Sequence, residues 1–156
     1  MGDYRKGQTE HTFLLDEDVK HLADLFPPRR VKTLSKVRLP GNAADPAIVR
    51  MAWNRQLTIV TGNAQHFRKR IEEFQSRGAK DCSCLFGLVI LPSGEAIQRH
   101  VLRDWKRLEG ELRYKRKRVT WKDVHRDNYQ VRVLKNGRAQ VSQLPRCKTL
   151  HGEDSG

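Results

Sequence analysis

Acidic and polar residues follow apolar segments of the chain at positions where they could hold a metal ion. Residues 16–18 (Asp-Glu-Asp) and residues 61–63 (Thr-Gly-Asn) have this placement, and Asp45 joins them at the start of a predicted helix. Carboxylates at close range repel one another unless a cation lies between them, and oxygen ligands of this kind suit Mg²⁺ or Mn²⁺. A magnesium ion held by carboxylates and waters can activate a water and stabilise charge on a phosphodiester. The sequence therefore predicts a divalent metal site that hydrolyses phosphodiester bonds.

These residues can meet only if the segments before them are neighbouring strands of one parallel sheet. Apolar runs predict four strands, at 12–15, 31–37, 57–61 and 85–91. Apolar spacing and capping residues predict four helices, at 19–26, from 45 onwards, at 64–76 and at 95–113. Strands that alternate with helices favour a parallel α/β sheet covered on both faces. In such a sheet, functional groups collect at the carboxyl ends of the strands.

The last third of the chain has a different pattern. A charge run at 115–118 is followed by alternating segments at 129–134 and 138–144, which flank an Asn-Gly pair and predict a β-hairpin. We therefore expect four regions: a flexible N-terminus at 1–11, an α/β domain at 12–113, a basic extension with the hairpin at 114–145, and a loose tail at 146–156.

The charge balance predicts a polyanionic partner. Lysine and arginine total 31 against 18 acidic residues, which gives a net charge of +13. Basic side chains displace counterions from nucleic acid, so RNA is the expected partner. The candidate RNA contacts are basic residues of the long helix and the following charge run: Arg99, Arg103, Lys106, Arg107, Lys115, Arg116, Lys117 and Arg118. Trp121 could stack on a base beside them, although a solvated helix face and an exposed linker explain the same residues.

Two classes of protein are excluded by composition. The sequence has no apolar run near the ~20 residues that cross a bilayer, and its first residues lack the apolar stretch of a signal peptide. The three cysteines are an odd number, which suits free thiols in a reducing compartment, and the spacing of Cys82 and Cys84 does not fit a zinc site. We expect a cytoplasmic protein with no membrane contact.

Most of the acidic and polar positions also have an ordinary structural explanation. Asp45 precedes a proline and can cap a helix, and Asn63 and Asp18 can cap the helices that follow them. Asp16 is the exception, because an aspartate that ends a buried strand has no evident local partner.

Three segments together resemble the motif pattern of PIN-like nucleases, in their small prokaryotic branch. They are 13–19 (FLLDEDV), 44–52 (ADPAIVRMA) and 59–67 (IVTGNAQHF), and the similarity covers about residues 12–91. The resemblance implies a three-layer α/β/α fold with a central, mostly parallel sheet at 12–113. It also implies a Mg²⁺- or Mn²⁺-dependent ribonuclease, and many members of the family are toxins of toxin–antitoxin pairs.

The resemblance also implies roles for individual residues. The metal-binding and catalytic set, with the ion held chiefly by the first two, is Asp16, Asp45, Asp18 and Asn63. Thr61 would orient a ligand or water, and His66 would contact phosphate or cap a helix.

Two departures from the family pattern leave an alternative open. No acid stands between Asp24 and Asp45, where the family has a glutamate, and Asn63 replaces a carboxylate. The alternative is a PIN-like module that binds RNA or a protein with weak or absent catalysis. An antitoxin-like protein and a second copy of the chain remain open as partners.

Overall fold

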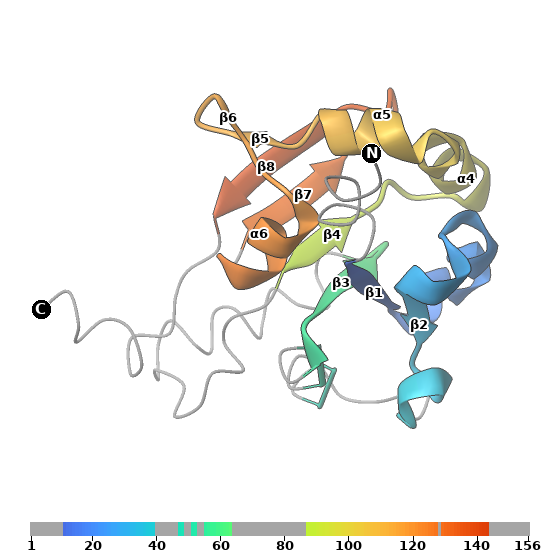
Figure 1. Cartoon of the computed structure of the whole chain (residues 1–156). Helices are drawn as coiled ribbons and strands as arrows, with labels where there is room; N and C mark the ends of the chain where they lie inside the picture. The colour runs from blue at the N-terminus through green and yellow to red at the C-terminus, as the bar shows by residue number, and fades with distance from the viewer. Residues whose placement is uncertain are drawn as a thin grey trace, which may run out of the picture.

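A mostly parallel six-stranded sheet forms the centre of the protein (Figure 1). The computed structural model describes residues 11–39, 47–48, 51–52, 55–63, 87–127 and 129–143. The strands lie in the order β2-β1-β3-β4-β7-β8. Their bounds are Thr12–Leu15 (β1), Val31–Thr33 (β2), Leu57–Thr61 (β3), Leu88–Ile90 (β4), Tyr129–Val133 (β7) and Ala139–Gln143 (β8). The four pairings from β2 to β7 are parallel, and β7 pairs with β8 antiparallel. The predicted α/β class with a mostly parallel sheet is confirmed.

Short helices connect these strands. Within the described residues, the 3-10 helices are η1 (Glu17–Leu25), η2 (Pro28–Arg30) and η3 (Ser35–Val37). The α-helices whose bounds fall in the described ranges are α4 (Glu95–Arg103), α5 (Trp105–Gly110) and α6 (Trp121–Arg126). Strands β5 (Arg113–Tyr114) and β6 (Lys117–Arg118) form a separate antiparallel pair, which stands out at the top of the molecule in Figure 1.

Both faces of the sheet are buried at the central strands β1, β3 and β4, as their apolar sequences require. On β1, Phe13 and Leu15 join a core cluster with buried residues of η1, α4, α5 and α6. Leu14, between them in sequence, points to the opposite face and packs with residues of η3 and with Ile48 and Ala52. Side chains of a strand alternate between faces, so β1 contributes to both cores.

The segment after β1 is a 3-10 helix, whereas the sequence predicted an ordinary helix at 19–26. Val19 and Leu22 are buried and Leu25 is partly buried, and their spacing of three matches the three residues per turn of a 3-10 helix. The predicted strand at 31–37 is also shorter, because residues 35–37 form η3 and Arg38 ends it at a φ of +64°.

The predicted long helix at 95–113 is two helices. Asp104 separates α4 from α5 and caps α5 by accepting a hydrogen bond from the Arg107 backbone N–H at 3.1 Å. Aspartate is a favoured N-cap residue, so the break has a local cause.

The predicted hairpin is confirmed, but it belongs to the central sheet rather than to an extension. β7 pairs with β4, with Val89 opposite Val131. Val131 and Val133 are buried in the core that lies over β1, and this apolar face explains the placement. Gly137 takes the positive φ, +87°, that the turn needs.

Several expectations lie outside the described residues. These are the N-terminus at 1–10, the helix at 64–76 and the tail at 146–156. Residues 47, 48, 51 and 52 are helical, as expected for the segment after Asp45. The domain boundaries remain predictions. Among the described residues, no helix is long and apolar enough to span a bilayer.

Candidate functional site

Asp16 is placed by the parallel pairing of β1 with β3. Leu15 lies opposite Val60, and the Asp16 backbone N–H donates to the Val60 carbonyl at 2.9 Å. Asp16 therefore lies beside Thr61 at the carboxyl end of the sheet. Its side chain is buried, with Oδ1 accepting from the Glu17 N–H at 2.9 Å and Oδ2 from the Thr61 hydroxyl at 3.0 Å. Asp16 therefore caps η1 and also accepts a hydrogen bond from β3.

Asp18 joins the same group from the first turn of η1. Its Oδ2 accepts the Gly62 backbone N–H at 3.1 Å, and its Oδ1 lies 3.5 Å from the Thr61 hydroxyl oxygen. The Asn63 backbone N–H donates to that oxygen at 3.0 Å. We call Asp16, Asp18 and residues 61–63 the carboxyl-edge cluster. The structure brings together four of the residues that the sequence predicted for this place: Asp16, Asp18, Thr61 and Asn63.

Gly62 and Gln98 complete the surroundings of Asp18, and of these two the sequence pattern pointed only to Gly62, within residues 61–63. A Cβ on Gly62 would lie 3.0 Å from Asp18 Oδ2 and 3.0 Å from Gln98 Nε2. Gln98 is buried on α4 and donates to the Pro92 carbonyl at 2.9 Å. A polar residue on the inward face of α4, between Ile97 and Val101, was the available signal.

The donor chemistry of the carboxyl-edge cluster fits a hard divalent cation. Its side chains offer oxygen atoms from two carboxylates and a hydroxyl, and Mg²⁺ is bound through one or two carboxylates together with waters. Within the described ranges, no group of three His, Cys, Asp or Glu side chains is arranged to hold a metal. Asp45 and His66 lie outside the described residues.

The predicted RNA contacts on the long helix divide into two kinds. Arg99 is half-buried and joins α4 to η1: its guanidinium contacts Glu95 at 3.0 Å and Asp24 at 3.2 Å, and donates to the His21 carbonyl at 3.0 Å. Its charge is therefore committed within the protein. The other three are exposed basic residues: Arg103, Lys106 and Arg107.

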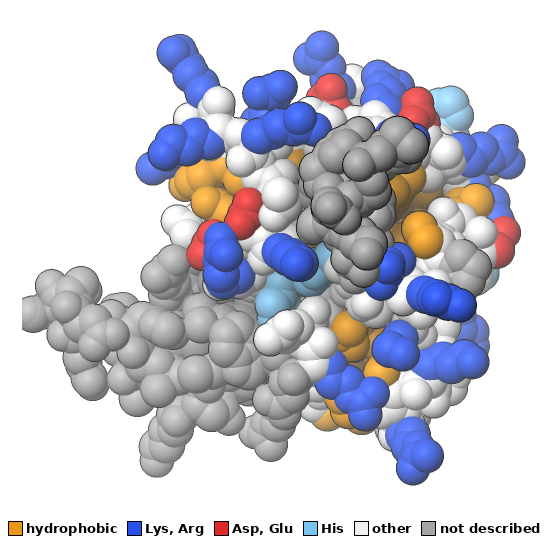
Figure 2. Space-filling model, viewed as in Figure 1, with side chains coloured by type: hydrophobic (Ala, Val, Ile, Leu, Met, Phe, Trp, Pro, Cys, Tyr) orange, Lys and Arg blue, Asp and Glu red, His pale blue; other side chains and the backbone are white. Residues whose placement is uncertain are grey.

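The charge run at 115–118 forms the turn and the second strand of the β5–β6 hairpin, and its four side chains are exposed. Lys115 and Arg116 occupy the turn with φ values of +50° and +70°, which non-glycine residues rarely adopt. The Lys115 ammonium lies 5.3 Å from the centre of the Tyr114 ring, a cation–π contact that helps to hold the turn. Figure 2 shows Lys and Arg side chains spread widely over one face of the molecule.

Trp121 does not stack on RNA, because it is fully buried. Its ring lies 5.2 Å from Trp105 and 5.0 Å from Phe13, and its indole N–H donates to Glu109 at 3.0 Å. Burial raises the pKa of Glu109, although the hydrogen bond from Trp121 opposes this. A capping box at Thr120 starts α6 and turns the indole inward.

No protein-family model, curated protein or solved structure matches the chain.

Proposed function

We propose that the protein is a PIN-like, Mg²⁺- or Mn²⁺-dependent ribonuclease. The observation that carries the proposal is the Thr61 hydroxyl, which lies 3.0 Å from Asp16 Oδ2 and 3.5 Å from Asp18 Oδ1. The carboxyl end of β3 thereby holds the carboxylates of Asp16 and Asp18 close to a single hydroxyl oxygen. The motif resemblance of residues 13–19 and 59–67 supports the same assignment.

Each residue of the cluster has a role that follows from its position. Asp16 and Asp18 would hold the cation through oxygen atoms, and Thr61 would keep the two carboxylates in place. Asn63 would supply an amide, and the family resemblance adds Asp45 as a further carboxylate. A bound Mg²⁺ or Mn²⁺ would lower the pKa of a coordinated water and stabilise charge on the phosphodiester.

The basic surface supplies the complementary half of the proposal. An acidic cluster repels nucleic acid unless cationic side chains near it attract the phosphates. The exposed cations of α4, α5 and the β5–β6 hairpin would do so: Arg103, Lys106, Arg107, Lys115, Arg116, Lys117 and Arg118.

An RNA cleavage assay with Mn²⁺ tests the proposal. Asp16→Asn and Asp18→Asn keep the side-chain shape and remove the charge, so we expect each to lower cleavage about 100-fold or more, as loss of a group that positions a metal does. Asp45→Asn tests the residue implied by the family resemblance. Asp24→Asn is the matched control, because Asp24 is an exposed aspartate of η1 whose ion pair with Arg99 contributes little stability.

The outcome is decisive when folding is measured in parallel. Thermal unfolding should show that each variant keeps its structure at the assay temperature. Cleavage by Asp16→Asn at the wild-type rate, or wild-type cleavage that persists with excess chelator, would contradict the nuclease.

A second candidate function is binding of RNA without cleavage. Asn63 favours it, because an amide stands where the family places an acid, and this removes one negative charge from the cluster. Calorimetry separates the two functions: the RNA-binding module predicts salt-sensitive RNA affinity with no Mn²⁺ affinity, whereas the nuclease predicts Mn²⁺ binding that Asp16→Asn abolishes.

A further inference from the structure

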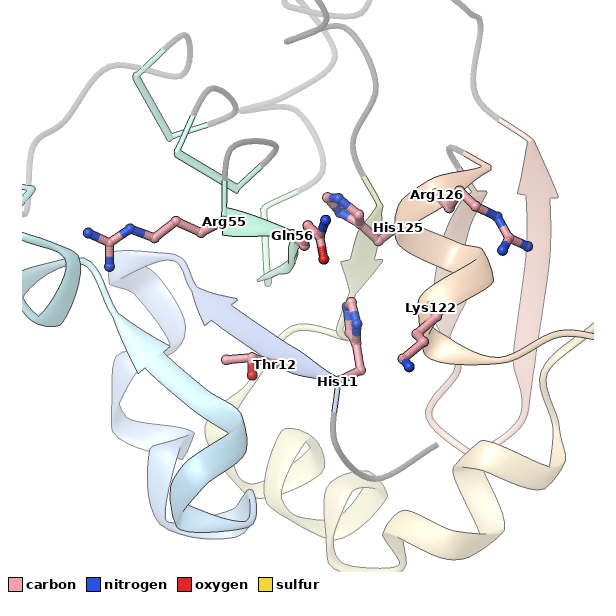
Figure 3. A pocket seen from close by; sticks show the side chains of 7 residues that line it. All are labelled: His11, Thr12, Arg55, Gln56, Lys122, His125 and Arg126. Carbon is pink, nitrogen blue, oxygen red and sulfur yellow. The ribbon is translucent and has the colours of Figure 1, made fainter. Parts of the chain in front are cut away.

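A pocket of about 460 Å³ lies at the opposite, amino end of the parallel strands (Figure 3). Its lining comes from the residues just before β1 and β3 and from α6, which precedes β7. We call it the amino-edge pocket, and it is lined by His11, Arg55, Gln56, Lys122, His125 and Arg126. His11 and Asp16 stand at the two ends of β1, five residues apart, which corresponds to about 16 Å along a strand. The pocket is therefore separate from the carboxyl-edge cluster.

The lining of the amino-edge pocket is positively charged. Among the described residues that line it, three are lysine or arginine and none is aspartate or glutamate. The Arg126 guanidinium is paired with Asp123 at 2.5 Å and Asp127 at 3.4 Å, and in Figure 3 it points away from the histidines. The Lys122 ammonium instead reaches toward His11 (Figure 3). The Arg55 guanidinium also extends away from the histidines, so Lys122 is the cation that faces them (Figure 3).

Two buried histidines form the floor of the pocket. The rings of His11 and His125 are 6.0 Å apart, and His11 Nε2 is hydrogen-bonded to Thr58 Oγ1 at 2.6 Å. Burial, with a smaller effect from His125 and Lys122, lowers the pKa of His11 to about 4. Burial also lowers the pKa of His125, and a backbone hydrogen bond to Leu57 opposes this. Both imidazoles are neutral at pH 7, so they can offer hydrogen bonds without adding charge.

Gln56 is held at the pocket by an unfavourable backbone conformation. Its φ is +57°, in the left-handed region that costs a non-glycine residue about 1 kcal/mol. This conformation directs its amide toward His125 (Figure 3). Strained residues cluster at ligand-binding sites, because the surrounding structure must hold them there.

We propose that the amino-edge pocket binds a phosphate monoester, with Lys122 supplying the charge and Gln56 a hydrogen-bond donor. The dianion suits the cationic side chains among the described lining residues, none of which is a carboxylate. The volume lies in the range of small-ligand sites and accommodates a mononucleotide. The phosphate can come from a free nucleotide or from the end of an RNA strand. The proposal is independent of the metal site.

Phosphate binding is measured by NMR titration of the full chain without added metal, so that neither cleavage nor cation binding enters the readout. The probes are inorganic phosphate and a nucleoside 5′-monophosphate. We expect saturable shifts of the His11 and His125 ring signals. Because an anion favours the protonated ring, the pKa of His11 should rise by about one unit or more at saturation.

Two variants locate the binding. Lys122→Gln should weaken phosphate binding roughly tenfold, as expected for a lost charge-assisted hydrogen bond. Lys135→Gln is the matched control, because Lys135 is an exposed lysine in the β7–β8 turn at the other end of the sheet, and it should leave the affinity unchanged. Absence of saturable binding, or equal weakening by both variants, would overturn the proposal.

RNA oligonucleotides with a 5′-phosphate or a 5′-hydroxyl distinguish the two sources. Tighter binding of the phosphorylated strand, lost in Lys122→Gln, assigns the pocket to a strand end. Equal binding of both strands, with displacement of neither by the mononucleotide, assigns it to a free nucleotide. If Lys122→Gln weakens binding of the hydroxyl strand as much as that of the phosphorylated strand, the pocket does not recognise a phosphate monoester.

Discussion

The two ends of β3 each place a buried threonine against a titratable side chain from the ends of β1. At the amino end, Thr58 is hydrogen-bonded to His11, and at the carboxyl end Thr61 donates to Asp16. Both threonines are fully buried, and both partners are nearly so. One parallel register therefore positions a base at one edge of the sheet and an acid at the other.

The difference between the two edges lies in what surrounds these pairs. At the carboxyl edge, the carboxylates of Asp16 and Asp18 accept hydrogen bonds from the backbone N–H groups of Glu17 and Gly62. At the amino edge, burial and Lys122 keep His11 neutral. Two edges of opposite electrostatic character can hold a cation and an anion on one small domain.

The largest expected effect is a loss of stability from a substitution that disturbs the amino edge alone. A Cβ on Gly87 would lie 2.7 Å from the Val124 carbonyl oxygen and 2.9 Å from His125 Cα. These are backbone atoms, so no side-chain rotation can relieve the clash. Gly87→Ala should therefore lower the free energy of unfolding by about 3 kcal/mol. Gly110→Ala is the control, because nothing lies within 4 Å of the added methyl group. Denaturant unfolding measures both, and a cost below about 1 kcal/mol for Gly87→Ala would contradict the packing of α6 on β4.

The pH dependence of stability should come in part from the amino edge. The folded state lowers the pKa of His11 from 6.5 to about 4, so the unfolded chain binds more protons in that window. Stability from this residue is complete above pH 6.5 and falls by about 2.5 kcal/mol between pH 7.5 and 4.5. The lowered pKa of His125 acts in the same direction.

His11→Gln isolates this contribution. Its unfolding free energy should vary less with pH than that of the wild type over the same window, as measured by urea unfolding at several pH values. Parallel curves for the two proteins would show that His11 titrates as it does in the unfolded chain.

A pair of threonine variants compares the two edges directly. Thr61→Val removes a hydrogen bond to a carboxylate and should cost about 2 kcal/mol, whereas Thr58→Val removes one to a neutral imidazole and should cost about 1 kcal/mol. Both residues lie on β3 and are fully buried, so each is the other's control. Thermal unfolding at pH 7 measures the two costs. A larger cost for Thr58→Val would contradict the prediction that the charged partner is at the carboxyl edge and the neutral one at the amino edge.

The smallest effect concerns the backbone of the amino edge. Gln56→Gly allows the positive φ without a Cβ and should stabilise the protein by about 0.5 kcal/mol, while it removes the amide from the pocket. The same variant should bind inorganic phosphate more weakly. A more stable variant with wild-type phosphate affinity would remove Gln56 from the proposed site.

The sequence predicted the strands well because their signals are local. The runs that became β1, β3 and the β7–β8 hairpin combine apolar or β-branched residues with clear turn residues. Asp16, Asp18, Thr61 and Asn63 were found because each follows or ends such a run at the same edge of a parallel sheet.

The features that were missed depend on contacts between distant segments. The sequence gives no local sign that β7 pairs with β4, and Trp121 looked exposed because it follows a charge run. Asp104 could have been recognised as a helix cap, because aspartate is a favoured residue there. The amino-edge pocket brings together His11 and α6, which are more than a hundred residues apart in the sequence, so no local motif predicts it.

The pairing of β7 with β4 has a consequence for any shortened version of the protein. The motif similarity ends near residue 91, so a cut after residue 113 would look harmless. That cut would remove β7, the strand that pairs with β4 and helps to bury Leu88, Val89 and Ile90. It would also remove the buried core residues Trp121 and Val124. We expect the truncated chain to aggregate through its bared strand, so the smallest fragment able to fold alone must run through β8.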